Sequence, residues 1–238
     1  MLWWITASLC AFFIKGLCGF ANTLVFTTIL SFHTANVNIS PVELILGYPS
    51  NIILAWKERR SIQWNICLPL ACMVAAGSIP GILFLKNADT DIIKIIFGII
   101  IIFIGLEMLI RELHPQKTKS SRAVLITIGI LSGLLCGLYG IGALLGAYLN
   151  RVTDNTSSFK ANICMVFLVE NTLRMFLYAW WGILTFDLLK QAAALLPFML
   201  AGLALGMLSS RILDEKAIRK CVIIMLMISG AALILNSL

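Results

Sequence analysis

The 238-residue chain is 60% hydrophobic and only 12% charged, and its mean hydropathy is +0.98. Soluble domains carry about 25% charged residues, so this composition excludes an ordinary water-soluble protein. The formal net charge of +7 comes from short basic clusters between apolar runs, which is typical of membrane topology signals and excludes a nucleic-acid-binding face.

Apolar segments of about 20 residues, each long enough to span a bilayer, recur along the whole chain. In chain order they cover residues 2–32, 41–56, 66–85, 92–110, 124–149, 161–181, 188–208 and 217–235. The polar stretch 111–122, which contains Pro115, is the expected linker between two halves. We therefore predict a first transmembrane repeat over residues 1–112, a basic linker over 113–122 and a second repeat over 123–238.

Glycines interrupt the first and the fifth segments at similar places. Residues 14–20 read IKGLCGF and residues 133–140 read GLLCGLYG, and aligning Cys18 with Cys136 matches these breaks at an offset of 118. Residues 77–81 and 202–206 each begin and end with glycine, at an offset of 125, a spacing that lets helix backbones approach closely. Glycine-broken helices at corresponding places in two halves point to a transporter binding site.

Lysine and arginine counts indicate how the broken segments lie in the membrane. If all eight segments cross, the two sides carry 8 basic residues each. If the first and fifth segments are re-entrant hairpins, 13 lie on one side and 3 on the other, and only this arrangement satisfies the positive-inside rule.

Each half then crosses three times, an odd number, so the two halves are inverted relative to each other. The prediction is an all-α polytopic protein of the cell membrane with two inverted four-segment repeats, each opening with a glycine-broken re-entrant helical hairpin. Its cytoplasmic loops are 57–60, 111–122, 151–160 and 211–220.

The two hairpin tips would place helix ends near the middle of the membrane. Helix amino ends carry partial positive charge and unpaired N–H groups, which attract anions. Glycines there would let an anion approach the backbone closely, although the alternative is that they only pack helices. The tip glycines are Gly16, Gly19, Gly137, Gly140 and Gly142.

Polar residues at membrane depth are further candidates for binding. Lys15 abuts the first tip and would supply positive charge to a substrate anion, unless it snorkels to the interface. Glu170 and Arg174 lie one helical turn apart. We predict that Arg174 binds the anion and that Glu170 is the coupling proton site, with a purely structural ion pair as the alternative. Asn162 and Asn171 lie nearby and could donate hydrogen bonds, and Asn51, at the helix bend expected over residues 47–51, is a weak candidate for the site.

Glu43 is a weaker candidate for the same site. Residues 40–43 read SPVE, which is a capping box with proline at the first helical position. We therefore expect Glu43 to cap its own helix.

Motifs for catalysis and metal binding are absent from the sequence. It contains no GxSxG, HExxH or Walker motif and no CxxC pair, and its two histidines, His33 and His114, lie in predicted loops. We predict no enzymatic activity, no metal and no cofactor. If the tips line a water-filled cavity, Cys18 and Cys136 should react with a charged maleimide, and substrate should protect them.

With its two four-segment halves, the glycine-broken opening segment of each and the basic linker, the chain resembles the sulfite exporter TauE/SafE family over nearly its full length. The tip KGLCG at residues 15–19 departs from the contiguous glycines common in that family. The resemblance implies an anion transporter, with sulfite and organosulfonates among the substrates.

We therefore expect a secondary transporter of a small anion, such as sulfite, an organosulfonate or a similar organic anion, that is proton-coupled and works by alternating access. Its partners would be that anion and the lipid bilayer, with no nucleic acid. The alternatives are a passive anion channel and a membrane-embedded interaction subunit.

Overall fold

The computed structural model is helical throughout the residues that it describes, which are 1–31, 36–87, 122–140, 142–153, 155–235 and nine single or paired positions between 95 and 110. The predicted linker before residue 122, most of the fourth apolar segment and both histidines lie outside the described residues.

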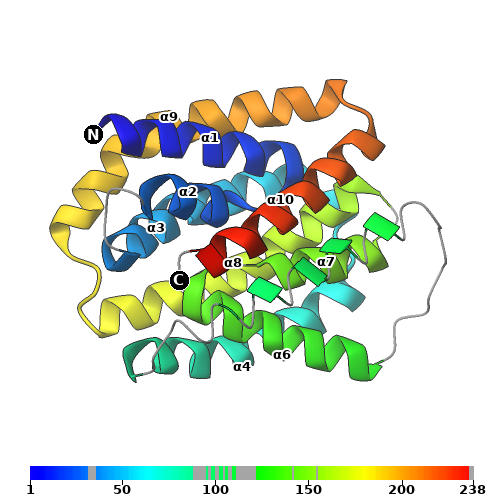
Figure 1. Cartoon of the computed structure of the whole chain (residues 1–238), viewed down its shortest axis with the longest axis horizontal. Coiled ribbons are helices and arrows are strands. Elements are labelled where there is room, and N and C mark those ends of the chain that lie inside the picture. The colour runs from blue at the N-terminus through cyan, green and yellow to red at the C-terminus, as the bar shows by residue number, and fades with distance from the viewer. Residues whose placement is uncertain are drawn as a thin grey trace.

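The helices in Figure 1 are α1 (Leu2–Cys18), α2 (Asn22–Ser31), α3 (Asn36–Lys57), the 3-10 turn η1 (Arg59–Ser61), α4 (Trp64–Asn87), α6 (Arg122–Tyr139), α7 (Ala143–Val152), α8 (Thr156–Trp180), α9 (Phe186–Ile212) and α10 (Glu215–Leu235).

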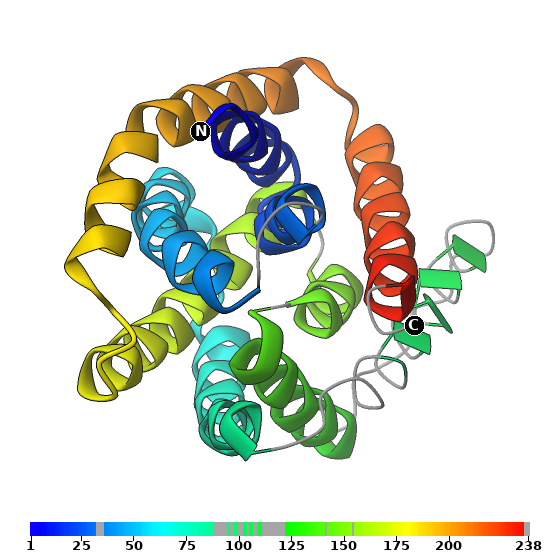
Figure 2. The same ribbon diagram turned by 60° about the vertical axis from the view of Figure 1, so that its left-hand side comes forward.

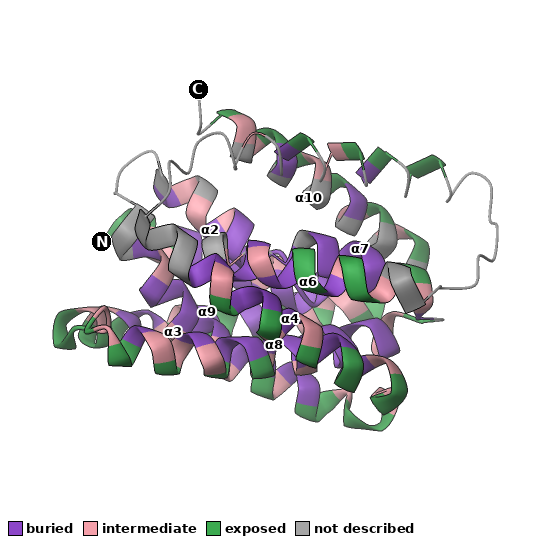
Figure 3. Cartoon of the chain, turned by 90° about the horizontal axis from the view of Figure 1, so that it is seen from below, coloured by how far each residue is buried: buried purple, intermediate pink, exposed green. Residues whose placement is uncertain are grey.

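The helices and their surface fit a membrane protein. Among the described residues, three stretches are long and apolar enough to cross a bilayer: Trp64–Ile82, Thr156–Trp180 and Phe186–Ile212. Large apolar side chains lie on the outside, with Trp180 76% and Ile212 85% exposed. Buried residues, including charged ones, gather in the interior (Figure 3). This distribution is the reverse of that in a water-soluble protein.

Both glycine-broken segments fold as two helices joined by a short turn. α1 ends at Gly19 with φ 90°, and α6 ends at Gly140 with φ 69°, a left-handed conformation that glycine adopts without strain. Their N–H groups donate to the carbonyls of Lys15 (2.6 Å) and Cys136 (2.8 Å) and close the two helices in the same way. Figure 1 shows α2 lying back along α1. The predicted breaks are confirmed, and their re-entrant position in a bilayer stays a prediction.

The opening helix of each half packs against a helix of the other half. α1 runs parallel to α9, and α6 runs parallel to α4, with backbones in direct contact. A Cβ atom on any of the four contacting glycines of α4 and α9 would lie 2.1–2.5 Å from a carbonyl oxygen, so a larger residue cannot be accommodated without movement. These contacts join Gly202 to Leu9, Gly206 to Phe13, Gly77 to Ile130 and Gly81 to Leu134.

These contacts correct the alignment of the two breaks. Leu9 and Ile130 are 121 residues apart, and so are Gly19 and Gly140, the two left-handed helix ends. The offset of 118 is therefore wrong by three residues. The Cys-Gly pair shared by both segments is misleading, because Gly137 lies inside α6, where it packs on α4, one turn before the helix ends.

α3 and α8 form the centre of the bundle and run antiparallel. Tyr48 and Thr172 meet through their hydroxyl groups at 3.1 Å, and Ser40 and Tyr178 at 3.4 Å. The short helices α2 and α7 lie inside the ring formed by the longer ones (Figure 2). α2 contacts α3, and α7 contacts α8, so the helix that follows each break packs against this central pair.

Candidate functional site

A cluster of buried polar side chains lies between the two helix breaks. It combines residues of α1, α2, α3 and α8 and includes four charged groups. Burying charge is costly unless it is paired, and ionisable residues at membrane depth are usually functional. The members, each less than 10% exposed, are Lys15, Asn22, Thr23, Glu43, Asn51, Glu170, Asn171 and Arg174, and we call them the central cluster.

Arg174 is the centre of this cluster. Its Nη1 lies 3.7 Å from Oε1 of Glu170, one turn earlier in α8, and its Nη2 lies 4.0 Å from Oε2 of Glu43 in α3. The guanidinium also donates hydrogen bonds to the carbonyl of Cys136 (3.1 Å) and to the hydroxyl of Ser40 (3.2 Å). The predicted proximity of Glu170 and Arg174 is confirmed, and Glu43 joins them as a second carboxylate.

Glu43 is fixed by the start of α2 and does not cap its own helix. Its Oε1 accepts hydrogen bonds from the side chains of Asn22 and Thr23, at 2.9 Å from Thr23. α3 already begins at Asn36, so the predicted capping box lies inside the helix and that prediction is wrong. The signal that could have identified the contact is the Asn-Thr pair directly after the first break.

The second break reaches the same guanidinium. A Cβ atom on Gly140 would lie 2.8 Å from Nη1 of Arg174 and 3.2 Å from Cγ2 of Thr23. Gly140 therefore lies beside both α8 and the first residues of α2, and a side chain at this position would have to displace the guanidinium. The start of α2, which follows the first break, therefore meets the second break beside Arg174.

Two asparagines predicted for the site also lie in the central cluster. The side-chain nitrogen of Asn171 lies near Gly47, close to Glu43. Asn51 is 1% exposed, and within the described structure neither its Oδ1 nor its Nδ2 has a hydrogen-bond partner. A buried amide without partners is destabilising, so Asn51 is available to bind a ligand or water.

Lys15 is buried at the end of α1. It is 1% exposed, so the alternative that it snorkels to the interface is wrong. Its Nζ lies 6.0 Å from the ring centre of Phe167, and its charge interacts with that of Glu43. The side chain therefore adds positive charge to the central cluster from the first break.

Three of the tip glycines lie in close packing contacts. A Cβ atom on Gly16 would meet the backbone of α9, one on Gly137 would meet the backbone of α4, and one on Gly142 would meet the ring of Phe167, all within 2.4 Å. These are the helix-packing contacts that the sequence analysis gave as the alternative to anion binding. A role for these three glycines in anion binding stays a prediction.

Sequence reasoning missed Lys160, which it counted as a loop cation. The residue lies in the first turns of α8 and is only 5% exposed. Its Nζ donates a hydrogen bond to the carbonyl of Gly16 (3.2 Å), and its Cγ would lie 2.8 Å from a Cβ atom on Gly19. The lysine therefore packs against the first break.

The chemistry of the central cluster is charge pairing and hydrogen bonding. In the part of the chain that the structure describes, no group of three His, Cys, Asp or Glu side chains is placed to hold a metal ion. The charged groups instead offer a guanidinium and an amine to an anion, with carboxylates that can exchange protons.

Comparisons with known proteins identify the family of the chain. Residues 4–233 match the protein family described as sulfite exporter TauE/SafE. The chain is also 23% identical over 183 residues to a Cupriavidus necator protein named "Probable sulfite/organosulfonate exporter TauE", an alignment that covers 73% of this chain and 71% of that protein. No solved structure matches the chain. Because the family match spans nearly all of its residues, the chain belongs to the sulfite exporter TauE/SafE family of membrane transporters.

Proposed function

We propose that this protein is a secondary transporter that carries a small anion of the sulfite and organosulfonate class across the cell membrane and binds it at Arg174. The observation that carries the proposal is the buried guanidinium beside the second helix break and the start of α2, within 4.0 Å of two carboxylates. A guanidinium is suited to bind sulfonate oxygens through paired hydrogen bonds. The printed name of the Cupriavidus necator relative supports this class of substrate.

The charge balance of the central cluster favours coupling to protons. Lys15 and Arg174 are balanced by Glu43 and Glu170, so the cluster has no net charge to attract an anion. Uptake of one proton by a carboxylate would leave a net positive charge and release the guanidinium from one partner. Anion binding and proton uptake would then favour each other.

Glu170 is the better proton acceptor of the two carboxylates. Glu43 accepts hydrogen bonds from Asn22 and Thr23 in addition to its contact with Arg174. Oε1 of Glu170 has no hydrogen-bond partner among the described residues and faces the guanidinium at 3.7 Å. Hydrogen bonds stabilise the ionised form, so Glu170 loses less on protonation.

The positions of three basic residues support the proposed topology. Lys57, Lys160 and Arg211 line one pocket at one end of the bundle. With the re-entrant hairpins, their loops lie on the same, cytoplasmic side, whereas eight full crossings would separate Lys57 from the other two. The antiparallel course of α3 and α8, which hold the same place in the two halves, supports the inverted repeat.

Alternating access would open this site to each side in turn. The central cluster is closed here, because Arg174 and Lys15 are each 1% exposed. The helix pairs α1–α9 and α4–α6 are joined through glycine contacts and would move as units. Rocking of one unit against the other would admit water and substrate from one side.

Flux into liposomes tests the proposal. The substrate should be methanesulfonate, because it stays ionised over the physiological range and any pH effect then belongs to the protein. We expect saturable uptake that responds to an imposed proton gradient and is lost in Arg174→Gln. Arg59→Gln is the matched control, because Arg59 lies on the outside against Trp56.

Other outcomes would favour the alternatives. Rapid passive flux without saturation or response to the gradient would indicate a channel. Absence of flux for every anion of the class, with folded protein in the membrane, would favour an interaction subunit. Normal transport by Arg174→Gln would overturn the site.

A further inference from the structure

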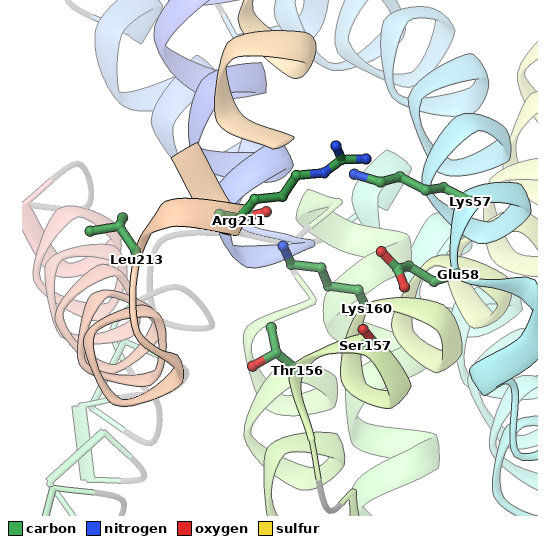
Figure 4. A pocket seen from close by; sticks show the side chains of 8 residues that line it. Lys57, Glu58, Thr156, Ser157, Lys160, Arg211 and Leu213 are labelled. Carbon is green, nitrogen blue, oxygen red and sulfur yellow. The ribbon is translucent and has the colours of Figure 1, made fainter. Parts of the chain in front are cut away.

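A second polar site lies at the end of the bundle where α3, α8 and α9 meet. A pocket of about 420 Å³ opens there. Its walls come from the end of α3 and the residue after it, the start of α8 and the end of α9 (Figure 4). The lining residues that carry charge or hydroxyl groups include Lys57, Glu58, Ser157, Lys160, Ser210 and Arg211.

Positive charge dominates this pocket. Lys57 and Arg211 point toward each other from α3 and α9, and Lys160 points toward them from α8 (Figure 4). Glu58 supplies the only carboxylate among the described lining residues. Cations that converge in this way repel one another unless an anion lies between them.

The start of α8 adds to the positive potential. Asn155 caps the helix by accepting a hydrogen bond from the N–H of Ser158 at 2.7 Å. The helix dipole is positive at this end. Helix start and side chains therefore attract the same kind of ligand.

Lys160 connects this pocket with the first helix break. It lines the pocket, yet it is only 5% exposed and its amine donates a hydrogen bond to the carbonyl of Gly16. Gly16 follows Lys15, whose charge interacts with Glu43 in the central cluster. One buried lysine, Lys160, thus lies between the pocket and the first helix break, on the way to the central cluster.

We propose that this pocket is a loading site, where a small oxyanion such as a sulfonate or sulfite binds to Lys57 and Arg211 before it passes Lys160 toward the central cluster. The identity of the ligand rests on the proposed function. The volume suits one small anion with its water, because ligand pockets start at about 300 Å³. The phosphate of an anionic lipid has the same charge chemistry, so the test separates these two sources.

Protection of an engineered thiol reports occupancy of the pocket. Ser157→Cys would be placed in a chain whose accessible thiols Cys10, Cys72 and Cys221 are replaced by alanine, reconstituted in phosphatidylcholine nanodiscs. We expect methanesulfonate to slow maleimide labelling several-fold. Asp187→Cys, at the opposite end of α9, is the control that should not respond.

Substitution of the two outer cations tests their role. Lys57→Gln combined with Arg211→Gln should remove the protection by methanesulfonate. In transport, this double variant should raise KM about fivefold and leave kcat nearly unchanged, because the pocket concentrates the anion without taking part in translocation. Persisting protection in the double variant would overturn the proposal.

Lipid binding is tested with nanodiscs that contain phosphatidylglycerol. Protection by this lipid but not by methanesulfonate would identify a lipid headgroup site and overturn the proposal, as would the absence of any protection. The loading site and the proposed function can fail separately. Protection without transport in the unmodified chain would refute the transport function alone, and transport without protection would refute the loading site alone.

Discussion

The two helix breaks have the same backbone and different chemistry. Each ends its first helix at a left-handed glycine, Gly19 or Gly140, and the opening helices pack on matching glycines. At the offset of 121, however, Lys15 corresponds to Cys136, and the Asn22-Thr23 pair corresponds to an Ala-Leu pair at residues 143–144. The first break therefore supplies charge and hydrogen-bond donors, whereas the second supplies a backbone carbonyl and the space beside a glycine.

This difference explains how a duplicated fold makes a single asymmetric site. The second break contributes the carbonyl of Cys136 and the space beside Gly140, both of which position Arg174 of α8. The first break contributes Lys15 and the donors that fix Glu43. A single anion is then surrounded by different groups from the two halves, which fits a substrate that presents several oxygens in different directions.

Among the variants that compare the two breaks, Lys15→Met should have the largest effect on transport. It leaves the two carboxylates with one cation, and an unbalanced buried charge costs about 3–5 kcal/mol. We expect methanesulfonate transport to fall by at least about 100-fold, which corresponds to about 3 kcal/mol. Cys136→Ser, at the corresponding place in the second break, should lower transport by less than about threefold, because it keeps the backbone carbonyl.

The amount of folded protein in the membrane must be measured beside the flux. Lys190→Met is the control, because this exposed lysine lies over the ring of Phe186 in the first turn of α9. Equal losses of transport in Lys15→Met and Cys136→Ser would show that the two helix breaks contribute alike, which would contradict the difference proposed between them.

Glu170→Gln should have the next largest effect, on the pH dependence of transport. In the unmodified protein, affinity for methanesulfonate should rise as the pH falls, because proton uptake by Glu170 releases Arg174. A glutamine imitates the protonated state, so the variant should transport at a rate that does not change with pH. The charged groups that face Glu170 are Arg174 of its own helix and Glu43 of α3.

Glu43→Gln separates the two carboxylates. Because Asn22 and Thr23 hold Glu43 in place, its loss should lower thermal stability and leave the pH dependence intact. If Glu43→Gln removes the pH dependence and Glu170→Gln does not, the coupling role belongs to Glu43.

Gly140→Ala should have a smaller effect that is specific to transport. A Cβ atom there would press on Nη1 of Arg174, in addition to the strain of about 1–2 kcal/mol that a positive φ imposes on alanine. Gly182→Ala is the matched control, because Gly182 has φ 67° and no atom within 4 Å of the added carbon. Gly182→Ala should lose only the Tm that the positive φ costs, Gly140→Ala should lose more, and only Gly140→Ala should raise KM. Equal KM values would show that Arg174 does not need this contact.

Sequence reasoning identified the features that depend on neighbouring residues. The helix breaks follow from glycines within apolar runs, the Glu170–Arg174 proximity follows from helical spacing, and the packing contacts of α4 and α9 follow from paired glycines. Arg174, Glu170, Asn51, Asn171 and Lys15 could be selected because polar residues at membrane depth are few.

The remaining contacts could not be read from local patterns. Arg174 binds Ser40 across 134 residues, and Lys160 binds Gly16 across 144. The capping-box interpretation of Glu43 failed because a start signal for a helix is also compatible with a position five residues inside one, and the partners in α2 decide its role. The alignment of the breaks failed because a repeated dipeptide does not reveal which glycine adopts the left-handed conformation.

Labelling of the native thiols gives the smallest expected effect and tests whether the two breaks open together. The sequence predicts that Cys18 and Cys136 react with a charged maleimide if the tips line a water-filled cavity, but both are 0% exposed here. Labelling should therefore be slow in the resting protein.

Alternating access requires the central cluster to reach water during each cycle, so turnover with a proton gradient and methanesulfonate should speed labelling several-fold at both thiols. Cys67 of α4 is the control for general loosening, because it is 2% exposed and its thiol contacts Asn162 of α8. Arg174→Gln should show no acceleration. Acceleration at Cys18 alone would show that only the first break moves, and acceleration at all three cysteines would indicate unfolding in place of a transport cycle.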